Sequence, residues 1–327
     1  MHVVVTGGAG FIGANLGRRL AGRAGIGRVI AYDNLSTGDP ANLDGVDVEL
    51  VVGDILDRDG LGKVLDRADA VVHLAARPSV PRSLADPLAS HDANVTGTIN
   101  VLEAARRSGC YVVAASSSSV YGATAVLPKH EDLATRPLSP YAASKLAAEA
   151  YVLAYGASFG LPSLALRFFN VYGPLQSTGH AYAAAIPAFV HAALSGEPLT
   201  VHGDGRQTRD FTFVGSVVDV LAEAVLGRIT ADTPVNLAFG ESVSIGRVIE
   251  LIGELVGRDL DVRHGPARTG DVRDSLGAND RLLRLFPDLA PVPLVDGLRA
   301  TVDWFAASGS YPVSTRRLTP APSAATG

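Results

Sequence analysis

Residues 2–20 read HVVVTGGAGFIGANLGRRL, and the expected architecture follows from this stretch. Its apolar start is typical of a buried strand, and its later part has apolar residues at helical spacing. The turn between them carries Gly7, Gly10 and Gly13, and Gly8 completes the spacing GxGxxG with the last two. Such glycines allow a tight turn and a close approach of the backbone to a pyrophosphate, whose charge the helix N-terminus favours. The stretch therefore predicts a dinucleotide-binding turn.

A carboxylate, Asp33, ends the next apolar run, RVIAYD. At this place an acidic side chain accepts hydrogen bonds from an adenosine ribose. It would repel a 2′-phosphate, and the segment DNLSTG (33–38) contains no arginine, so NAD is expected rather than NADP. A cap of the following turn is the alternative role for Asp33. For Asp54 of the segment GDI (53–55), a place at the adenine edge and a solvent-facing strand end are both open.

Short apolar runs alternate with helix-like stretches along the first half of the chain. Continuous apolar strands that alternate with helices indicate a parallel sheet covered on both faces, the doubly wound α/β (Rossmann) fold. The expected strands lie at 2–7, 28–33, 48–54, 70–76, 111–117, 163–171 and 234–240.

The pattern loosens after Gly173 and Pro174, which indicates a smaller, interleaved C-terminal substrate lobe. We expect residues 1–174, with roughly 214–240, to form the NAD-binding domain. The substrate lobe is expected at 175–213 and 241–305. The tail at 310–327 is rich in Pro, Ser, Thr and Ala, and it is expected to be disordered.

The composition argues against several classes of protein. A formal net charge of −5 argues against a nucleic-acid-binding surface. The single cysteine, Cys110, leaves no internal disulfide, and the eight histidines show no metal-ligand spacing. The sequence predicts neither a signal peptide nor a membrane-spanning run, so we expect a cytoplasmic protein without metal, membrane or nucleic-acid partners.

The segment SPYAASKLAAE places Tyr141 and Lys145 four residues apart at the start of a helix, on one face. An unperturbed tyrosine has a pKa near ~10 and is no base at neutral pH. A nearby ammonium and a positive nicotinamide bring this pKa toward the working pH. Ser116 to Ser119 follow the apolar run YVVAA, and the strands of such a sheet end at the ligand crevice. One of these hydroxyls is expected to bridge Tyr141 and the reacting hydroxyl; a strand-capping turn is the alternative.

Together these segments resemble the extended short-chain dehydrogenase/reductase family, specifically nucleotide-sugar 4-epimerases of the UDP-galactose 4-epimerase type. The resemblance covers about residues 1–305. Its marks are TGGAGFIG, YDNLSTG, GDI, HLAA, NVTGTINVLEAA, SSSSVYG, YAASK, RFFNVYGP, IPAFV and GDGRQTRDF.

The resemblance implies a role for each matching residue. It makes Tyr141 the catalytic base and acid, Ser117 the catalytic hydroxyl, and Lys145 a contact of the nicotinamide ribose. The implied cofactor is tightly bound NAD, held by Gly7, Gly10, Phe11, Ile12, Gly13, Asp33, Asn34, Ser36, Gly38, Asp54, Ile55, Leu74, Ala75, Ala76, Asn94, Tyr141 and Lys145. The implied substrate is a UDP-sugar, bound by Ser79, Arg82, Ser117, Ser118, Asn170, Val201, Arg209, Arg268 and Asp271. Two alternatives stay open: Arg209 pairs with Asp204 or Asp210, and Arg82 is a solvated loop residue.

The implied reaction inverts C4 of a UDP-hexose through a transient 4-keto intermediate. Related 4,6-dehydratases carry Asp-Glu directly after the catalytic hydroxyl, and related UDP-glucuronate decarboxylases usually carry Glu at the position of Ser119. Here Ser118 and Ser119 stand at these positions, and hydroxyls cannot supply that acid–base chemistry at neutral pH. A 4-epimerase is therefore expected. The alternatives are a decarboxylase or dTDP-sugar-modifying enzyme of the same family and, more remotely, a non-catalytic NAD-binding sensor.

The sequence is compatible with more than one sugar. In the family a bulky side chain at the position of Ser275 blocks N-acetylated sugars, and SVPRS (79–83) is similar to a loop of UDP-N-acetylhexosamine epimerases. UDP-glucose, UDP-N-acetylglucosamine and UDP-glucuronate are all compatible with these positions. By the same resemblance a homodimer is expected, through the helices at 97–109 and 142–159.

Overall fold

A seven-stranded sheet forms the centre of the molecule in a computed structural model that describes residues 1–177, 184–266 and 273–308. The strand order is β11-β6-β5-β4-β1-β2-β3, and each neighbouring pair is parallel. The strands are β1 (His2–Thr6), β2 (Arg28–Asp33), β3 (Glu49–Val52), β4 (Ala70–His73), β5 (Tyr111–Ser117), β6 (Ser163–Phe168) and β11 (Val235–Leu237). This is the doubly wound α/β fold expected from the sequence.

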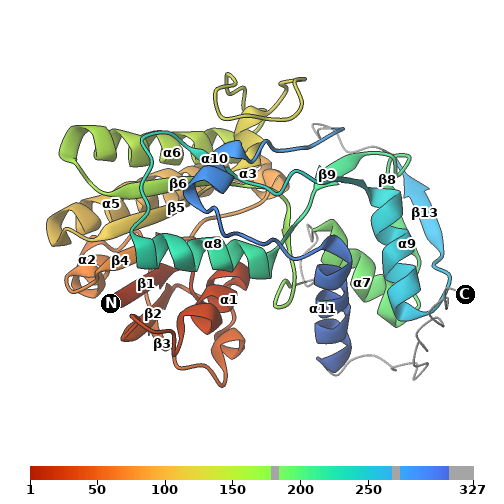
Figure 1. The fold of residues 1–327 in the computed structure, drawn as a ribbon, viewed down its shortest axis with the longest axis horizontal. Helices are drawn as coiled ribbons and strands as arrows, with labels where there is room; N and C mark the ends of the chain where they lie inside the picture. The colour runs from red at the N-terminus through yellow and green to blue at the C-terminus, as the bar shows by residue number, and fades with distance from the viewer. Residues whose placement is uncertain (178–183, 267–272, 309–327) are drawn as a thin grey trace, which may run out of the picture.

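Helices cover both faces of the sheet because successive strand residues point to opposite faces. Along β1, Val3 and Val5 are buried against α1 and α8, whereas Val4 is buried in a second core with α2, α5 and α6. Figure 1 shows α8 along one face and α5 and α6 on the other. The helices are α1 (Phe11–Leu20), α2 (Arg58–Leu65), α5 (Gly97–Ser108), α6 (Pro140–Phe159) and α8 (Val214–Gly227).

Helix α6 has clear start and stop signals. Ser139 accepts a hydrogen bond from the Ala142 N–H at 3.1 Å, and Pro140 occupies the first helical position. Gly160 ends the helix with a φ of 65°. A capping serine followed by proline favours a helix start, and a left-handed glycine favours a helix end. These signals place Tyr141 in the first turn of α6 and Lys145 in the second.

Short helical segments connect the strands near their carboxyl ends. They are the 3₁₀-helices η1 (Pro40–Leu43) and η3 (Ser118–Tyr121), the α-helices α3 (Val80–Ala85) and α4 (Pro87–His91), and the π-helix η2 (Asp92–Thr96). The expectation that SVPRS forms a loop is wrong, because Ser79 caps α3 and the next four residues are helical.

A second lobe has a hydrophobic core of its own and lies on the right in Figure 1. It contains α7 (Ala185–Ser195), α9 (Ile245–Val256), α11 (Leu294–Ala307) and the parallel strands β8 (Leu199–His202) and β13 (Val262–Gly265). Two further pairs join β7 (Val171–Tyr172) to β10 (Thr212–Phe213) and β9 (Thr208–Asp210) to β12 (Ser242–Ser244). Helix α10 (Asp280–Leu285) packs on the sheet side instead, where Leu282 joins the α1/α8 core.

The division into two domains stays a prediction, and the expected tail at 310–327 lies outside the described residues. No helix within the described ranges is long and apolar enough to cross a membrane. In the same ranges, no group of His, Cys, Asp or Glu side chains could hold a metal ion.

Candidate active site

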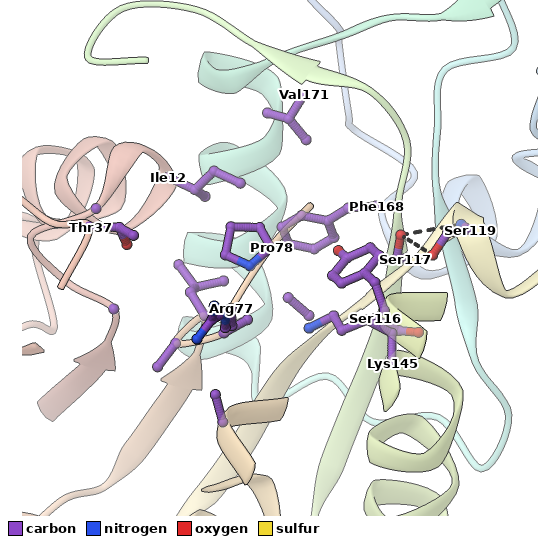
Figure 2. A pocket seen from close by; sticks show the side chains of 18 of the residues that line it. Ile12, Thr37, Arg77, Pro78, Ser116, Ser117, Ser119, Lys145, Phe168 and Val171 are labelled. Atoms are coloured by element: carbon purple, nitrogen blue, oxygen red, sulfur yellow. Dashed lines mark hydrogen bonds between the residues drawn. The ribbon is translucent and has the colours of Figure 1, made fainter. Parts of the chain in front are cut away.

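A cleft of about 1150 Å³ opens at the carboxyl ends of the sheet strands, between the sheet and the second lobe. Strand order runs outward from β1 in both directions, and a crevice forms where the order reverses. In Figure 2, Ser117 and Lys145 lie on one side of this cleft, and Ile12 and Thr37 lie across it. The lobe contributes Arg209, Asp274 and Ser275.

The turn after β1 is packed too closely for side chains. Gly7 has a φ of 71°, and a Cβ there would lie 2.8 Å from the Ala75 backbone nitrogen. A Cβ on Gly13 would collide with the Gly7 carbonyl, so α1 can start directly against the turn only with glycine at that position. Gly10 precedes α1 without a side-chain cap and lines the cleft. The backbone at the start of α1 is therefore accessible to a diphosphate.

Asp33 is buried at the end of β2 and lines the cleft. Its Oδ2 accepts the Ala9 N–H at 3.0 Å, and its Oδ1 accepts the Leu35 N–H at 2.8 Å. The carboxylate is thus anchored to the glycine turn and also caps the turn after β2. A Cβ on Gly38 would lie 2.9 Å from either carboxylate oxygen. Gly38 does not line the cleft; it leaves room for Asp33.

The other expected cofactor residues separate into two groups. Phe11, Ile12, Asn34, Ser36, Asp54, Ile55, Leu74, Ala75 and Ala76 line the cleft. Asp54 accepts a 2.8 Å hydrogen bond from Asn34 Nδ2, so both polar groups face the same region. Asn94 is buried behind the cleft wall. It accepts the Arg77 N–H at 2.7 Å and donates to Ser144 Oγ at 2.9 Å, so it ties the segment after β4 to α6.

The end of β5 and the start of α6 bring the three expected catalytic residues together. Ser117 caps η3, and its Oγ accepts hydrogen bonds from the Ser119 N–H at 3.2 Å and the Ser119 hydroxyl at 2.9 Å (Figure 2). Burial raises the pKa of the Tyr141 phenol, and its hydrogen bond with Ser117 lowers it. Burial lowers the pKa of Lys145 to about 8, although the Glu149 carboxylate raises it.

His73, at the end of β4, is a structural residue. Its Nδ1 lies 2.8 Å from Thr6 Oγ1, and its Nε2 lies 3.0 Å from Thr98 Oγ1. Burial, with the charge of Lys145, lowers the pKa of His73 to about 3, so the ring stays neutral. His73 is thus a buried, hydrogen-bonded strand residue.

The expected substrate residues are not all in the cleft. Ser118, Asn170 and Arg209 line it, and Val201 lines an adjoining cavity of about 290 Å³ with Asn170 and Arg209. Ser79 and Arg82 are not among the lining residues; Ser79 Oγ instead accepts the Arg82 N–H at 3.4 Å. Arg268 and Asp271 lie outside the described residues.

Arg209 is held partly by backbone carbonyls. Its Nη1 donates to the Thr208 carbonyl at 2.8 Å and to the Arg273 carbonyl at 2.9 Å. The neighbouring Asp210 accepts backbone N–H bonds, including one from Gly277 at 3.0 Å. This arrangement holds the Arg209 side chain against the segment that carries Asp274 and Ser275.

Sequence reasoning missed several polar residues around the cleft. Lys129 lines it, is only 4% exposed, and donates to the Thr124 carbonyl; burial lowers its pKa. Glu149 and Arg167 form a buried ion pair that contacts Ser116, the chain neighbour of Ser117. The spacing of Glu149, four residues after Lys145 on α6, was a signal that could have been used. No signal predicted Lys129.

The fold, the glycine turn and the anchored Asp33 together define an NAD-binding protein of the Rossmann class. The family model described as "NAD dependent epimerase/dehydratase family" matches residues 3–238. The chain therefore belongs to this family, and its resemblance to extended short-chain dehydrogenases/reductases of the UDP-galactose 4-epimerase type is confirmed.

Three similar proteins show the range within the family. UDP-glucose 4-epimerase of Mycolicibacterium smegmatis is 36% identical over 312 residues, 93% of this chain and 98% of the relative. dTDP-glucose 4,6-dehydratase of Streptomyces griseus is 36% identical over 313 residues, 93% of this chain and 94% of the relative. The crystal structure of the Thermus thermophilus UDP-glucose 4-epimerase with NAD has a TM-score of 0.85 and 35% identity, and the match covers 94% of this chain and 100% of that one. The protein is thus similar to epimerases and to a dehydratase alike.

Proposed function

We propose that the protein is an NAD-dependent UDP-sugar 4-epimerase. The observation that carries this proposal is the placement of Ser117, Tyr141 and Lys145 on one cleft, with Ser117 at the end of β5 and the other two in the first two turns of α6. The two positions after Ser117 hold hydroxyls instead of an acid and a base. The site therefore has groups for moving one proton at a sugar hydroxyl, and at these two positions it has no acid–base pair for eliminating the C6 hydroxyl.

The residues of the cleft fit NAD. The bare backbone before α1 would take the diphosphate, Asp33 the adenosine ribose, and Lys145 the nicotinamide ribose. Each Asp33 oxygen accepts one backbone hydrogen bond and retains a lone pair for a ribose hydroxyl. When bound, NAD⁺ accepts the C4 hydride of the sugar and returns it.

The chain's own residues would handle the proton. Tyr141, as phenolate, takes the proton of the 4-hydroxyl while Ser117 holds that oxygen. The positive charge of Lys145 stabilises the phenolate and thus makes Tyr141 a base near neutral pH. Tyr141 then returns the same proton to the 4-oxygen after the sugar has presented its other face. No net oxidation occurs, so one bound NAD serves many turnovers.

The 4,6-dehydratase reaction is the second candidate, favoured by the identity to the Streptomyces griseus enzyme. It needs an acid and a base to remove the C6 hydroxyl, and at this place the chain has Ser118 and Ser119. Ser119 already donates its hydroxyl to Ser117. The absence of carboxylates at these two positions supports epimerisation over elimination.

The sugar-binding side of the cleft is compatible with several hexoses. Ser275, at the position where the family places a bulky blocking side chain, is small and lines the cleft, which supports room for an N-acetyl group. The adjoining cavity with Val201 is where we place the uracil base. A homodimer through α5 and α6 belongs to this proposal by family resemblance.

Proton NMR of the products tests the proposal. The purified protein is incubated with each sugar without added NAD. UDP-glucose, UDP-N-acetylglucosamine, UDP-glucuronate and dTDP-glucose are supplied in separate tubes. The expected product in at least one UDP-sugar tube has an inverted H4 coupling pattern and an unchanged C6. A pentose or a 4-keto-6-deoxy sugar would replace the proposal with decarboxylation or dehydration, and no turnover in any tube would refute it.

A further inference from the structure

A buried ion pair contacts Ser116 and shares helix α6 with two of the candidate catalytic residues. Glu149 lies on α6, one turn after Lys145 and two turns after Tyr141. It accepts hydrogen bonds from Arg167 Nε at 2.9 Å and from Arg167 Nη2 at 2.7 Å. Ser116 Oγ donates to the same carboxylate at 2.6 Å. The two charged side chains are only 3% and 4% exposed.

The pair reaches two walls of the cleft. Ser116 is the chain neighbour of Ser117, so its bond to Glu149 fixes the end of β5 against α6. The Arg167 guanidinium lies 4.7 Å from the ring centroid of Tyr121, a residue that lines the cleft. Tyr121 is held from its other end by a 2.6 Å hydrogen bond from its hydroxyl to Asn236 Oδ1.

We infer that the Glu149–Arg167 pair positions the site: it fixes Ser117 through Ser116 and sets a carboxylate charge behind Lys145. This inference rests on the proposed function, because it assigns roles toward Ser117 and Lys145. Glu149 and Arg167 are positioning residues, since neither is placed against the substrate or the cofactor.

Stability alone does not account for the pair. Removing two charges from water is costly, and an apolar pair of similar volume is often as stable or more stable. A bidentate arginine–carboxylate pair does, however, fix geometry more tightly than an apolar contact. The ion pair is therefore better explained by the geometry that it fixes around Ser116 and by the charge that it places near Lys145.

Glu149 is the charged group that favours the protonated form of Lys145. Tyr141 shares the helix, and His73 faces Lys145 from β4 as a neutral ring. Arg77 and Asp92 line the same cleft from the segment after β4 and from η2, and Arg167 and Tyr121 lie on the far side of Glu149. Of these groups, Glu149 raises the pKa of Lys145 against the effect of burial. Without it, Lys145 would lose its proton at a lower pH.

The sequence offers a direct measurement, because the chain has only three lysines, Lys63, Lys129 and Lys145. Protein with its bound NAD is labelled with ¹³Cε-lysine, and the Lys145 signal is assigned by its loss in Lys145→Arg. The titration midpoint of that signal is compared between the wild type and Glu149→Gln. We expect the variant midpoint to fall by about one pH unit, while the signals of Lys63 and Lys129 keep their midpoints.

Three further variants distinguish the effect of the Glu149 charge on Lys145 from the positioning of Ser117 and from a loss of folding. Glu149→Leu/Arg167→Leu removes both charges and should stay folded, yet lower the Lys145 midpoint and kcat. Ser116→Ala should lower kcat about tenfold without moving the midpoint. Glu250→Gln removes a carboxylate paired with Arg247 at 3.0 Å on the surface of α9, and both readouts should stay at the wild-type value.

The outcomes distinguish this inference from the proposed function. A folded double variant with an unchanged Lys145 midpoint and wild-type kcat would overturn the inference, whatever reaction the wild type performs. If the wild type does not epimerise any sugar, the proposed function fails, and the NMR midpoints still decide the charge part of the inference.

Discussion

Tyr141 needs positive charge before it can act as a base. Burial raises the pKa of its phenol, and the hydrogen bond with Ser117 offsets only part of this effect. The ammonium of Lys145 and the nicotinamide charge of NAD⁺ are the groups that stabilise the phenolate. The proton transfer should therefore be slower when any one of Ser117, Tyr141 and Lys145 is replaced.

Tyr141→Phe removes the proton-transfer group and keeps the ring. We expect kcat to fall about 10³-fold, with the affinity for UDP-sugar nearly unchanged. The measurement is the rate of H4 inversion by NMR, with isothermal titration for binding. Tyr151→Phe, on the exposed side of the same helix, is the matched control and should keep wild-type kcat. Equal rates for Tyr141→Phe and the control would exclude Tyr141 as the base.

The pH dependence of the activity should follow the protonation of Lys145. Its pKa is about 8, so it is charged below that pH and loses the proton as the pH rises through it. We expect activity to fall above pH about 8. In Lys145→Arg the guanidinium stays protonated well above this range, so the alkaline fall should disappear although kcat is lower. A fall at the same pH in both proteins would show that another group titrates.

Asp33 should contribute to the affinity for NAD. Asp33→Asn leaves a polar side chain and removes the charge, and a charged hydrogen bond contributes about 1.5–3 kcal/mol. We therefore expect the Kd for NAD to rise roughly 10- to 100-fold, measured on apoprotein by isothermal titration. Asp39→Asn, which alters the cap of η1, is the control. A Kd that changes equally little in both variants would count against Asp33 as the ribose contact.

At the scale of elements, the strand–turn–helix start was predictable because its residues are constrained locally. Gly7 and Gly13 have no space for a Cβ, and Ser139 with Pro140 starts α6, so the chemistry of single positions fixes these elements. Asn94 behaves differently: its amide is used inside the protein, and only the packing of the π-helix against α6 reveals this. Helix α3 was missed because six residues are too few to show a repeating helical pattern of apolar residues.

The turn itself can be tested through Gly13. In Gly13→Ala the new Cβ would collide with the Gly7 carbonyl, so α1 must shift away from the turn. We expect a loss of NAD and a thermal midpoint several degrees lower, measured by cofactor release and differential scanning fluorimetry. In the control Gly62→Ala, inside α2, the new Cβ would lie 3.6 Å from Arg107 Nη2, and the free energy of unfolding should rise by about 0.5–1 kcal/mol. A Gly13→Ala protein that keeps NAD and stability would contradict the packing account.

At the scale of the whole molecule, sequence patterns predicted the sheet better than the second lobe. The sheet strands are continuous apolar runs, whereas β9, β12 and β13 are short and partly exposed, so they carry little periodic signal. The pairing of β8 with β13 joins segments far apart in the chain, and local sequence does not encode it. The ion pair of Glu149 with Arg167 is likewise a contact between separate elements.

The expected homodimer belongs to this scale. A dimer would have twice the 33.8 kDa mass of the chain, which sedimentation equilibrium at micromolar concentration can measure. We expect the dimer mass, and we expect Tyr151→Asp on the exposed side of α6 to weaken the association. A monomer mass for the wild type would remove this part of the proposal.

The central claim, inversion at C4 by internal return of hydride, is tested most directly with UDP-glucose that carries deuterium at C4. If this sugar is not turned over, the same label is used in whichever UDP-hexose the protein inverts. The protein is incubated in ordinary water without added NAD, and the product is analysed by ¹H and ²H NMR. We predict a C4-inverted sugar that keeps its deuterium at C4. Loss of the label to water, or its appearance at C6 of a 4-keto-6-deoxy sugar, would contradict the account.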